Sequence, residues 1–530
     1  MKITHIPFQK TGFFSKIMID YLEKKEEINP FYHHFPDLDG FKKQLKEKKS
    51  SFKISTRQVL VDALKKQYIN HKISEKTQLN IELLQQKNTF TITTGHQLNL
   101  FTGPLYFLYK IISAINVCEE LTDKFPDENF VPIYWMATED HDFDEINYFN
   151  FDGKKVNWNR NDGGAVGQFS TDGLEAVFEV FSEHLPNSKN AEFIKKLFSE
   201  GYLKHTNLAD ATRFIAHELF GKYGLVIVDG DDKSLKNLFV PFVKDELQNQ
   251  TSFKEVSKTI FTLEKKYSIQ VNPREINLFY LSENSRERII LENGIYKVND
   301  TNISWSIAEI LKEVADYPEK FSPNVIMRPL YEEVILPNLC YIGGGGEIAY
   351  WLELKSYFEA VKVPFPILLL RNSVQIISKK QQGKLDKLNI SSEEIFLNQH
   401  DLLSKKVVEN SDIETDFSNK KEFLQQQFNE LKEVAQKTDK SFIGAVKAQE
   451  KKQLKGLENL EKRLLKAEKR RQNDLVERII EIQNQLLPNE SLEERQRNFS
   501  EYYLAYGNTF LDVLKTELKP LQLEFTIIEL

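Results

Sequence analysis

The feature that most restricts the fold of this chain is an apolar, helix-like stretch at residues 105–121, which lies between two strand-like runs. The runs, residues 89–92 and 130–135, are rich in β-branched and aromatic side chains, which strands favour. Strand, helix and strand in this order predict a βαβ unit with parallel strands. A histidine-bearing loop follows each run, so we expect both loops at the edge where open parallel sheets bind ligands.

Two later runs extend this predicted sheet. Residues 224–231 predict a third parallel strand, and residues 365–371, which begin near prolines, predict another buried strand. Residues 1 to about 85 have apolar side chains at helical spacing. Strand candidates at residues 268–271 and 277–281 indicate a small inserted domain between about 250 and 320. The predicted class is therefore α/β with a parallel-sheet core.

The segment from about 418 to 487 has a different composition, without proline and rich in Lys, Glu, Gln and Leu. Apolar residues between Ile443 and Leu486 recur mostly every three or four positions, with a charged interruption near Arg471, which predicts a narrow coiled-coil seam. Residues 438–441 are a candidate reversal, so two helices can fold back on each other, the longer spanning about 70 Å. A β-rich run at residues 523–528 is expected to return to the core.

Composition and charge exclude several classes of protein. An apolar fraction of 41% is sufficient for a packed interior, and a net charge of −7 argues against nucleic-acid binding as the main role. The only cysteines, Cys118 and Cys340, exclude a disulfide framework and a thiolate zinc site. Neither a secretion signal nor an apolar run of about 20 residues is present, so we expect a cytoplasmic protein without a membrane partner.

The first histidine loop contains Gly95 and His96 and leads through Pro104 into the predicted helix. Unpaired N–H groups at the start of a helix attract anions, and an imidazole beside them would add a donor, as in nucleotidyl-transferring Rossmann enzymes. Read alone, His96 is more often a structural hydrogen-bonding residue. The motif is therefore weak evidence by itself.

The second loop places five carboxylates around one imidazole, namely Glu139, Asp140, Asp142, Asp144 and Glu145 around His141. At the end of a buried strand these charges need compensation by a divalent metal, by a cationic substrate group or by arginines such as Arg328 and Arg371. Metal coordination by His141 with Asp140 or Asp142 is chemically allowed but has no diagnostic spacing. An acidic surface turn is the alternative without a ligand.

A third element joins Arg328-Pro329-Leu330 to four glycines, Gly343 to Gly346, which open an amphipathic helix. Glycines at a helix start allow a ligand to approach the backbone closely. The pattern lacks the lysine of a P-loop and the spacing of a dinucleotide-binding fingerprint, and a plain flexible turn is the alternative.

These motifs together resemble the cysteine-adding enzymes of bacillithiol biosynthesis, the BshC family. The residues that carry the resemblance are Thr94-Gly95-His96-Gln97, Phe101-Thr102-Gly103-Pro104-Leu105, residues 135–146, Arg328-Pro329-Leu330 and Gly346-Glu347-Ile348-Ala349-Tyr350-Trp351. The resemblance covers essentially the whole chain. One departure is Gly345, which stands where the family pattern Gly-Pro-Gly-Glu has proline.

The resemblance implies a Rossmann-like core with connective-peptide insertions, a long α-helical coiled-coil domain and a homodimer formed through the helical part. The expected domains are residues 1–250, the first part of the core with an insertion near 151–200; 251–322, a connective-peptide domain; 323–380, the second part of the core; 381–498, the coiled coil; and 499–530, a segment returning to the core.

The resemblance also implies that cysteine is joined to glucosaminyl-malate, with the cysteine carboxylate first activated, most simply by ATP as an adenylate or acyl phosphate. In this hypothesis His96, Gln97 and the adjacent helix start stabilise phosphate charge, Asp140 or Asp142 binds an amine, His141 is the general base and Arg328 holds the malate carboxylates. The expected substrate-binding residues are Gln97, Asn99, Glu139, Arg328, Glu347 and Tyr350. The expected nucleotide-binding residues are Gly95, His96, Gly103, Gly343, Gly344, Gly345 and Gly346.

Mg²⁺ can accompany the nucleotide, and no tightly bound metal is expected. Two other classes remain open from the sequence. One is a metal-dependent hydrolase that uses the acidic cluster around His141. The other is a non-catalytic scaffold whose working surface is the helical arm.

Overall fold

The computed structural model describes residues 1–160, 163–438 and 440–530 and contains a central sheet of five parallel strands in the order β13-β12-β2-β3-β6. The strands are β2 (Thr89–His96), β3 (Asn129–Met136), β6 (Val226–Asp229), β12 (Asn338–Gly343) and β13 (Ile367–Leu370). The chain builds outward from β2 through β3 to β6 and then returns to the other side of β2 for β12. The predicted parallel sheet and the four strands predicted for it are thereby confirmed, whereas β12 was not predicted as a strand. The switch point of this doubly wound order lies between β2 and β12.

Helix α5 (Tyr106–Lys124) makes the crossover from β2 to β3. Both strands are buried along nearly their whole length, because helices and loops cover both faces of the sheet. α5 itself is buried on most sides, since it packs between the sheet and the C-terminal helix α22 (Asn508–Glu517). A helix buried in this way has an almost continuous apolar sequence, as the prediction required.

The other face of the sheet is covered in part by α2 (Leu38–Ser51), which packs on β12 and β13. Gln44 Nε2 donates to the carbonyl of Phe365 at 3.0 Å. Lys48 Nζ lies 2.7 Å from Glu333 Oε2, and both side chains are at most 1% exposed. α2 is therefore anchored by polar contacts between buried groups as well as by apolar packing.

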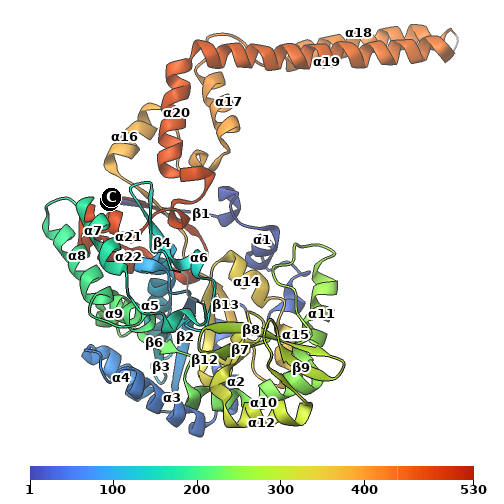
Figure 1. Ribbon diagram of the computed structural model, residues 1–530. Coiled ribbons are helices and arrows are strands. Elements are labelled where there is room, and N and C mark those ends of the chain that lie inside the picture. The colour runs from blue at the N-terminus through green and yellow to red at the C-terminus, as the bar shows by residue number, and fades with distance from the viewer. Residues whose placement is uncertain (161–162, 439) are drawn as a thin grey trace.

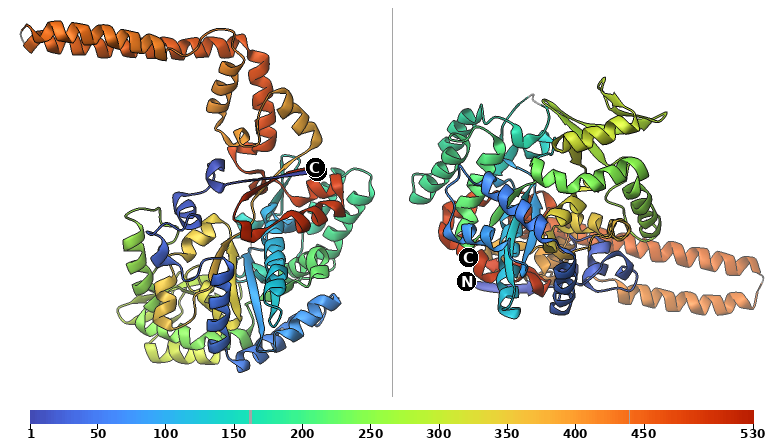
Figure 2. Two further views of the ribbon diagram at one scale, coloured as in Figure 1. Left: turned by 180° about the vertical axis from the view of Figure 1, so that it is seen from behind. Right: turned by 90° about the horizontal axis from the view of Figure 1, so that it is seen from below.

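The remaining helices of the core surround the sheet, as Figures 1 and 2 show. They are α1 (Lys16–Leu22), α3 (Ile54–Gln67), α4 (Glu75–Leu83), α6 (Phe143–Ile146), α7 (Leu174–Glu183), α8 (Lys189–Tyr202), α9 (Leu208–Phe220), α10 (Lys233–Asn249), α11 (Thr251–Leu263), α13 (Arg328–Ile335), α14 (Gly345–Trp351) and α15 (Lys355–Val361). A hairpin of β4 (Tyr148–Phe151) and β5 (Lys154–Asn157) follows α6. Within residues 1–160, 163–438 and 440–530, no helix combines the length and the apolar composition that a membrane span requires.

Between β6 and β12 the chain forms a second, antiparallel sheet in the order β10-β9-β8-β7-β11, with α12 (Ile307–Asp316) beside it. Its strands are β7 (Leu278–Ser282), β8 (Ser285–Glu292), β9 (Ile295–Val298), β10 (Ser304–Trp305) and β11 (Phe321–Pro323). The strand predicted at residues 277–281 is present. The one predicted at 268–271 is wrong, because the N–H of Gln270 bonds to the Glu353 carboxylate at 2.8 Å instead of to a neighbouring strand.

Both ends of the chain meet in a third sheet. β15 (Phe525–Glu529) pairs antiparallel with β1 (Lys2–Ile6) and parallel with β14 (Val374–Ile377). The predicted return of the C-terminal run to the core is confirmed. β1 was not predicted, since an exposed five-residue edge strand has little hydrophobic pattern to reveal it.

The helical region contains α16 (Lys379–Lys387), α17 (Gln399–Glu409), α18 (Ser418–Gln436), α19 (Lys440–Arg471) and α20 (Asn473–Leu486), and α21 (Phe499–Tyr506) follows it. α18 and α19 form a hairpin that extends far from the core (Figure 1). The predicted fold-back is confirmed, although Asp439 of the predicted reversal lies outside the described residues. Leu424, Phe428, Ala435, Ile443 and Val446 pack between the two helices.

The expectation that the longer helix spans about 70 Å is wrong, because it divides into α19 and α20 near the charged interruption at Arg471. The backbone leaves helical geometry at Gln472, with φ −100° and ψ 37°, and α20 turns back toward the core (Figure 1). Gln472 Nε2 donates to the carbonyl of Val407 in α17 at 3.1 Å, so a tertiary contact stabilises the bend. The prediction of a homodimer through this region stays a prediction.

Lys48 and Glu333 allow a test of the core. Lys48→Met removes the partner of a buried carboxylate and should lower the free energy of unfolding by about 3–5 kcal/mol. The matched control is the adjacent residue, Lys49→Met, whose pair with Glu128 at 2.7 Å is half exposed on the lysine side and should contribute about 0–1 kcal/mol. Urea denaturation of both variants measures the difference. Equal losses in the two would contradict this account of the pair.

Candidate active site

A cavity of about 660 Å³ opens at the C-terminal ends of β2 and β12, at the switch point of the sheet. Nine residues that the sequence predicted for a site lie on its wall: Gly95, His96, Gln97, Asp140, Arg328, Gly344, Gly346, Glu347 and Tyr350. The rest of the wall consists of Tyr106, Lys110, Trp135, Ala137, Glu145, Gln270, Val325, Glu332, Tyr341, Arg371 and Arg495. All three predicted motifs thus contribute to one cavity, as parallel-sheet topology requires.

His96, the last residue of β2, is buried against the ring of Phe107, with centroids 5.0 Å apart. One ring nitrogen bonds to the backbone of Thr102, whereas Nε2 is buried without a hydrogen-bond partner among the described residues. Burial, followed by the charges of Lys110 and Arg371, holds the pKa of His96 well below its usual value. The ring is therefore neutral at neutral pH, and in this tautomer Nε2 presents an acceptor to the cavity.

The loop after His96 has an unusual backbone, with φ of 47° at Phe101, 68° at Thr102 and 62° at Gly103. Such conformations persist only where the surroundings hold them. Asn498 Nδ2 donates to the carbonyls of Phe101 and Gly103 at 2.8 and 2.6 Å, and Phe101 N–H donates to the hydroxyl of Tyr202 at 2.7 Å. The position of His96 thus depends on a residue about 400 positions further along the chain.

Lys110 joins the two strands of the switch point. Its ammonium donates to the carbonyl of Gly95 at 2.6 Å and lies 2.6 Å from Glu347 Oε2, while the lysine side chain is only 4% exposed. Glu347 in turn accepts from Tyr341 Oη at 2.8 Å and from Gly344 N–H at 2.8 Å. Burial lowers the pKa of Lys110, and the Glu347 carboxylate opposes this effect.

The glycine loop is held by the same carboxylate. Gly345 occupies the position where the family pattern has proline, and the bond from Gly344 N–H to Glu347 fixes the start of α14 without it. A Cβ at Gly343 would lie 2.9 Å from Cβ of Glu347, so a glycine is needed there for packing. Gly343 and Gly345 do not line the cavity, unlike Gly344 and Gly346.

Arg371 and Arg495 add positive charge to the cavity wall. Arg371 is buried and donates to Glu494 at 2.7 Å, which raises its pKa against the effect of burial, and its Nε has no hydrogen-bond partner among the described residues. Arg495 is exposed and lines the cavity from the segment that follows the helical arm. Together with Lys110 and Arg328 they give the cavity four cationic side chains.

The acidic loop meets two arginines. Asp140 Oδ1 lies 3.7 Å from Arg286 Nη1, and its Oδ2 lies 3.8 Å from Arg328 Nη1. Burial alone would raise the pKa of Asp140, but Arg328 and then Arg286 lower it below its usual value, so the carboxylate is charged. Arg286 is itself buried, which lowers its pKa to about 10.

His141 bonds to the same arginine. Arg286 Nη1 donates to His141 Nδ1 at 2.9 Å, so the neutral imidazole carries its proton on Nε2. Ligand atoms of Asp140, His141 and Asp142 lie within 4.8 Å of one another, as a metal site would need. The sequence did not decide whether a metal, a substrate group or arginines compensate the charge of the acidic loop. Arg286 and Arg328 provide this positive charge. Charge compensation therefore gives no reason to place a metal in this loop.

The other predicted site residues lie beside the cavity and not on its wall. Asn99 donates to the carbonyl of Glu145 at 3.2 Å, and Gly103 belongs to the loop that Asn498 holds. His141 and Asp142 follow the wall residue Asp140 but do not line the cavity. Glu139 points away from it, into a separate polar network.

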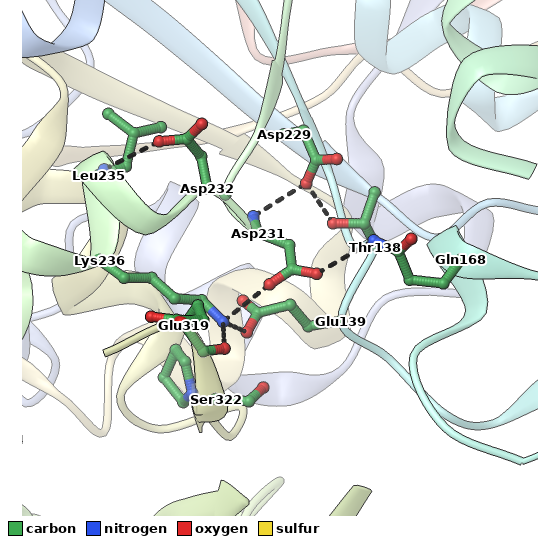
Figure 3. A network of polar contacts seen from close by, with 12 residues as sticks. Thr138, Glu139, Gln168, Asp229, Asp231, Asp232, Leu235, Lys236, Glu319 and Ser322 are labelled. Carbon is green, nitrogen blue, oxygen red and sulfur yellow. Dashed lines mark hydrogen bonds and ion pairs between the residues drawn. The ribbon is translucent and has the colours of Figure 1, made fainter. Parts of the chain in front are cut away.

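Figure 3 shows this network around Lys236 of α10. Its ammonium lies 2.6 Å from Glu139 Oε1 and 2.9 Å from Asp231 Oδ1, and it donates to the carbonyl of Glu319 at 2.8 Å. Burial opposes the charge of Lys236, but the two carboxylates raise its pKa above the usual value. The network fixes the start of the loop that places Asp140 in the cavity.

Sequence reasoning missed Lys110, Tyr106, Glu332 and Arg495. A signal existed for Lys110, because it is a single charged residue inside an otherwise apolar helical stretch. Glu332 is buried with Oε2 unpaired among the described residues, and burial raises its pKa well above the usual value against the opposing charge of Arg328. No local pattern marks Arg495, which reaches the cavity only through tertiary structure.

The doubly wound sheet, the charged cavity at its switch point and the helical hairpin define a Rossmann-like α/β protein with an appended coiled coil. The family model "Bacillithiol biosynthesis BshC, N-terminal Rossmann-like domain" matches residues 1–372, and "Bacillithiol biosynthesis BshC, C-terminal coiled-coil domain" matches residues 374–530. The chain belongs to the BshC family.

Relatives match over nearly the whole length. A protein of Flavobacterium psychrophilum named "Putative cysteine ligase BshC" is 61% identical over 525 residues, which cover 99% of both chains. A relative of the same name from Christiangramia forsetii is 57% identical over 528 residues, 99% of this chain and 98% of its own. Another of the same name, from Bacillus cereus, is 28% identical over 536 residues, 97% of both.

Asp229 at the end of β6 gives a pH test of the network in Figure 3, since burial and then the charge of Asp231 raise its pKa to about 6. In the unfolded chain the pKa of an aspartate is about 3.9. The stability that protonated Asp229 contributes to the folded state is therefore fully present below about pH 4 and is lost as the pH rises through 6. Asp229→Asn keeps an acceptor for the Thr138 hydroxyl and the Asp231 N–H but cannot ionise.

The Asp229→Asn variant should therefore gain stability relative to the wild type between pH 4.5 and 7.5, by at most about 3 kcal/mol. Thermal unfolding of both proteins across this range measures the gap. A gap that does not change with pH would show that Asp229 does not titrate in this way.

Proposed function

We propose that this chain is an ATP-dependent ligase that forms an amide bond between the carboxylate of cysteine and the amine of glucosaminyl-malate, the last step of bacillithiol biosynthesis. The observation that carries the proposal is one cavity with four cationic side chains and the charged carboxylate of Asp140, in a chain of the BshC family. Cations can hold carboxylates and phosphates, and a charged carboxylate can hold an amine. The relatives named as cysteine ligases support this reading.

The residues present fit a bound nucleotide. Arg371 Nε is a buried donor without a partner among the described residues, Lys110 and Arg495 add charge, and Gly344 and Gly346 leave space at the cavity wall. ATP, when bound, would supply the group that converts the carboxylate of cysteine into an acyl donor. Lys110 and Arg371 would stabilise the negative charge of the departing group, at roughly 3 kcal/mol per well-placed donor. Mg²⁺ remains a prediction.

In the bond-forming step the amine nitrogen attacks the activated carboxyl carbon. The new C–N bond forms as the C–O bond to the leaving group breaks, and the amine loses a proton. Asp140, which is charged and faces the cavity, would hold the amine. Nε2 of His96 would accept a hydrogen bond from a substrate N–H or O–H, in addition to the bond that the ring makes with Thr102. Arg328 and Arg495 would hold the malate carboxylates.

We assign the released proton to His141. Because its Nδ1 accepts a hydrogen bond from Arg286, this step requires Arg286 to transfer that bond to a substrate carboxylate. The ring would then present a free nitrogen next to Asp140. Proton transfer by a positioned side chain contributes about 10²–10⁴-fold to rate. The cytoplasmic location and the homodimer accompany this proposal as predictions.

Purified protein with cysteine, glucosaminyl-malate and ATP should form bacillithiol. AMP with pyrophosphate indicates an adenylate and ADP an acyl phosphate, whereas product without ATP, or no product, would contradict the proposal. His141→Ala should lower kcat by about 10²-fold or more. His96→Ala should lose about tenfold, the effect of one hydrogen bond, whereas His96→Gln, which keeps an acceptor, should lose less. Wild-type rates in both alanine variants would rule out these roles.

Replacing two glutamates of the cavity wall by glutamine should have sharply different effects on activity and stability. Glu332 is held protonated by burial, so Glu332→Gln keeps its charge state and shape and should change activity by no more than about twofold and stability by about 0.5 kcal/mol. Glu347→Gln leaves Lys110 buried without a carboxylate and should lower the free energy of unfolding by about 3 kcal/mol or more. Denaturation and product formation are measured for both. A damaging Glu332→Gln would mean that Glu332 acts as a carboxylate.

A further inference from the structure

A second group of potential ligands lies outside the cavity, where the loop of His33 and His34 meets Glu47 of α2. His33 Nε2 is 2.8 Å from Glu47 Oε2, and His34 Nε2 is 3.0 Å from Glu47 Oε1. One ligand atom from each of the three residues lies within 4.8 Å of the other two. Two imidazoles and a carboxylate thus converge on one point of the surface.

The ligands are held in place before any ion binds. Tyr32 and Phe35, on either side of the histidine pair, both pack on the buried ring of Tyr21, with centroids 5.1 and 5.5 Å away. Asp37, two residues further on, accepts from Gly40 N–H at 2.9 Å and so caps α2. The loop therefore has little freedom to move away from the helix.

Glu47 is equally fixed, because it lies between two anchored residues of α2. Gln44 bonds to the carbonyl of Phe365, and Lys48 pairs with the buried Glu333. The carboxylate is 40% exposed and His34 only 14%, so the convergence point is open to solvent on one side. A site held in this way loses little conformational entropy on binding an ion.

The protonation state also suits a metal. Burial lowers the pKa of His34, the neighbouring His33 lowers it further, and Glu47 opposes both effects. The centroids of the two rings are 4.0 Å apart. Lys43, whose positive charge also lowers the pKa of His34, disfavours a cation at this point. Neutral imidazole nitrogen is the form that binds metals.

We propose that His33, His34 and Glu47 bind a divalent transition-metal ion of the zinc type. Two imidazole nitrogens and one carboxylate oxygen suit such ions and not Mg²⁺ or Ca²⁺, which prefer oxygen ligands. Three protein ligands leave the fourth position to water. The ion would replace the two Nε2 protons that now face Glu47 and would tie the loop at 32–37 to α2.

This site differs from the other His–carboxylate cluster of the described residues, Asp140, His141 and Asp142, because there Arg286 donates to the imidazole. Among the described residues, no arginine or lysine donates a hydrogen bond to the imidazole of His33 or His34. The inference is independent of the proposed ligase activity. It also departs from the expectation that no tightly bound metal is present.

The test is titration of the chelator-treated, full-length chain with Zn²⁺ by calorimetry, and with Co²⁺ by visible absorption. The variants are His33→Ala, His34→Ala and Glu47→Gln. The matched control is His400→Ala, since His400 Nδ1 also lies near a carboxylate, 3.2 Å from Asp401, but has no second imidazole. Circular dichroism and melting temperature without metal verify that each variant is folded.

We expect one Zn²⁺ per chain at this site, a rise in melting temperature with Zn²⁺ and a Co²⁺ spectrum that reports nitrogen ligation. Each of the three variants should weaken binding by at least about tenfold, the loss typical even of residues that only support metal ligands, whereas His400→Ala should not. Absence of Zn²⁺ binding would overturn the proposal. Binding that survives in all three variants would also overturn it and would place the ion elsewhere, with Asp140→Asn as the next variant to titrate.

Discussion

The ion pair between the buried Lys110 and the partly exposed Glu347 is the interaction on which the candidate site depends. It joins α5, which follows β2, to α14, which follows β12. The order in which the chain adds strands to the sheet reverses between β2 and β12. The same ammonium holds the Gly95 carbonyl, and the same carboxylate holds Gly344 and Tyr341. Because the Lys110 ammonium is withdrawn from water, it needs the Glu347 carboxylate, and the pair ties the two halves of the switch point together.

The cavity is completed by residues from the far end of the chain. Asn498 satisfies the carbonyls of the left-handed loop after His96, Glu494 pairs with Arg371, and Arg495 adds an exposed cation to the wall. These residues follow the helical arm and lie in the part that matches the coiled-coil family model. The site therefore belongs to both family regions, and the arm stands between two segments of chain that contribute to it.

Charge compensation explains how the site keeps so many ionic groups in one cavity. Asp140 lies between two arginines, Arg371 is held by Glu494, and burial raises the pKa of Glu332, which disfavours its charged form. These arrangements leave His96 Nε2, Arg371 Nε and Glu332 Oε2 buried without partners among the described residues. Unpaired buried polar atoms are costly, and these three atoms are hydrogen-bonding groups that a substrate or water in the cavity can satisfy.

The sequence alone determined the parallel sheet, the helical hairpin and the three motifs that meet in the cavity, because periodicity and turn residues act locally and parallel strands bring their C-terminal ends together. Tertiary structure decided the rest. It bent the long helix at Gln472 and replaced a strand at residues 268–271 by a bond to Glu353. It also paired Glu139 with Lys236 and His141 with Arg286, and it placed Lys110 and Arg495 on the cavity wall. Long-range hydrogen bonds and ion pairs set these outcomes, and apart from the single charge of Lys110 in an apolar stretch they have no local pattern.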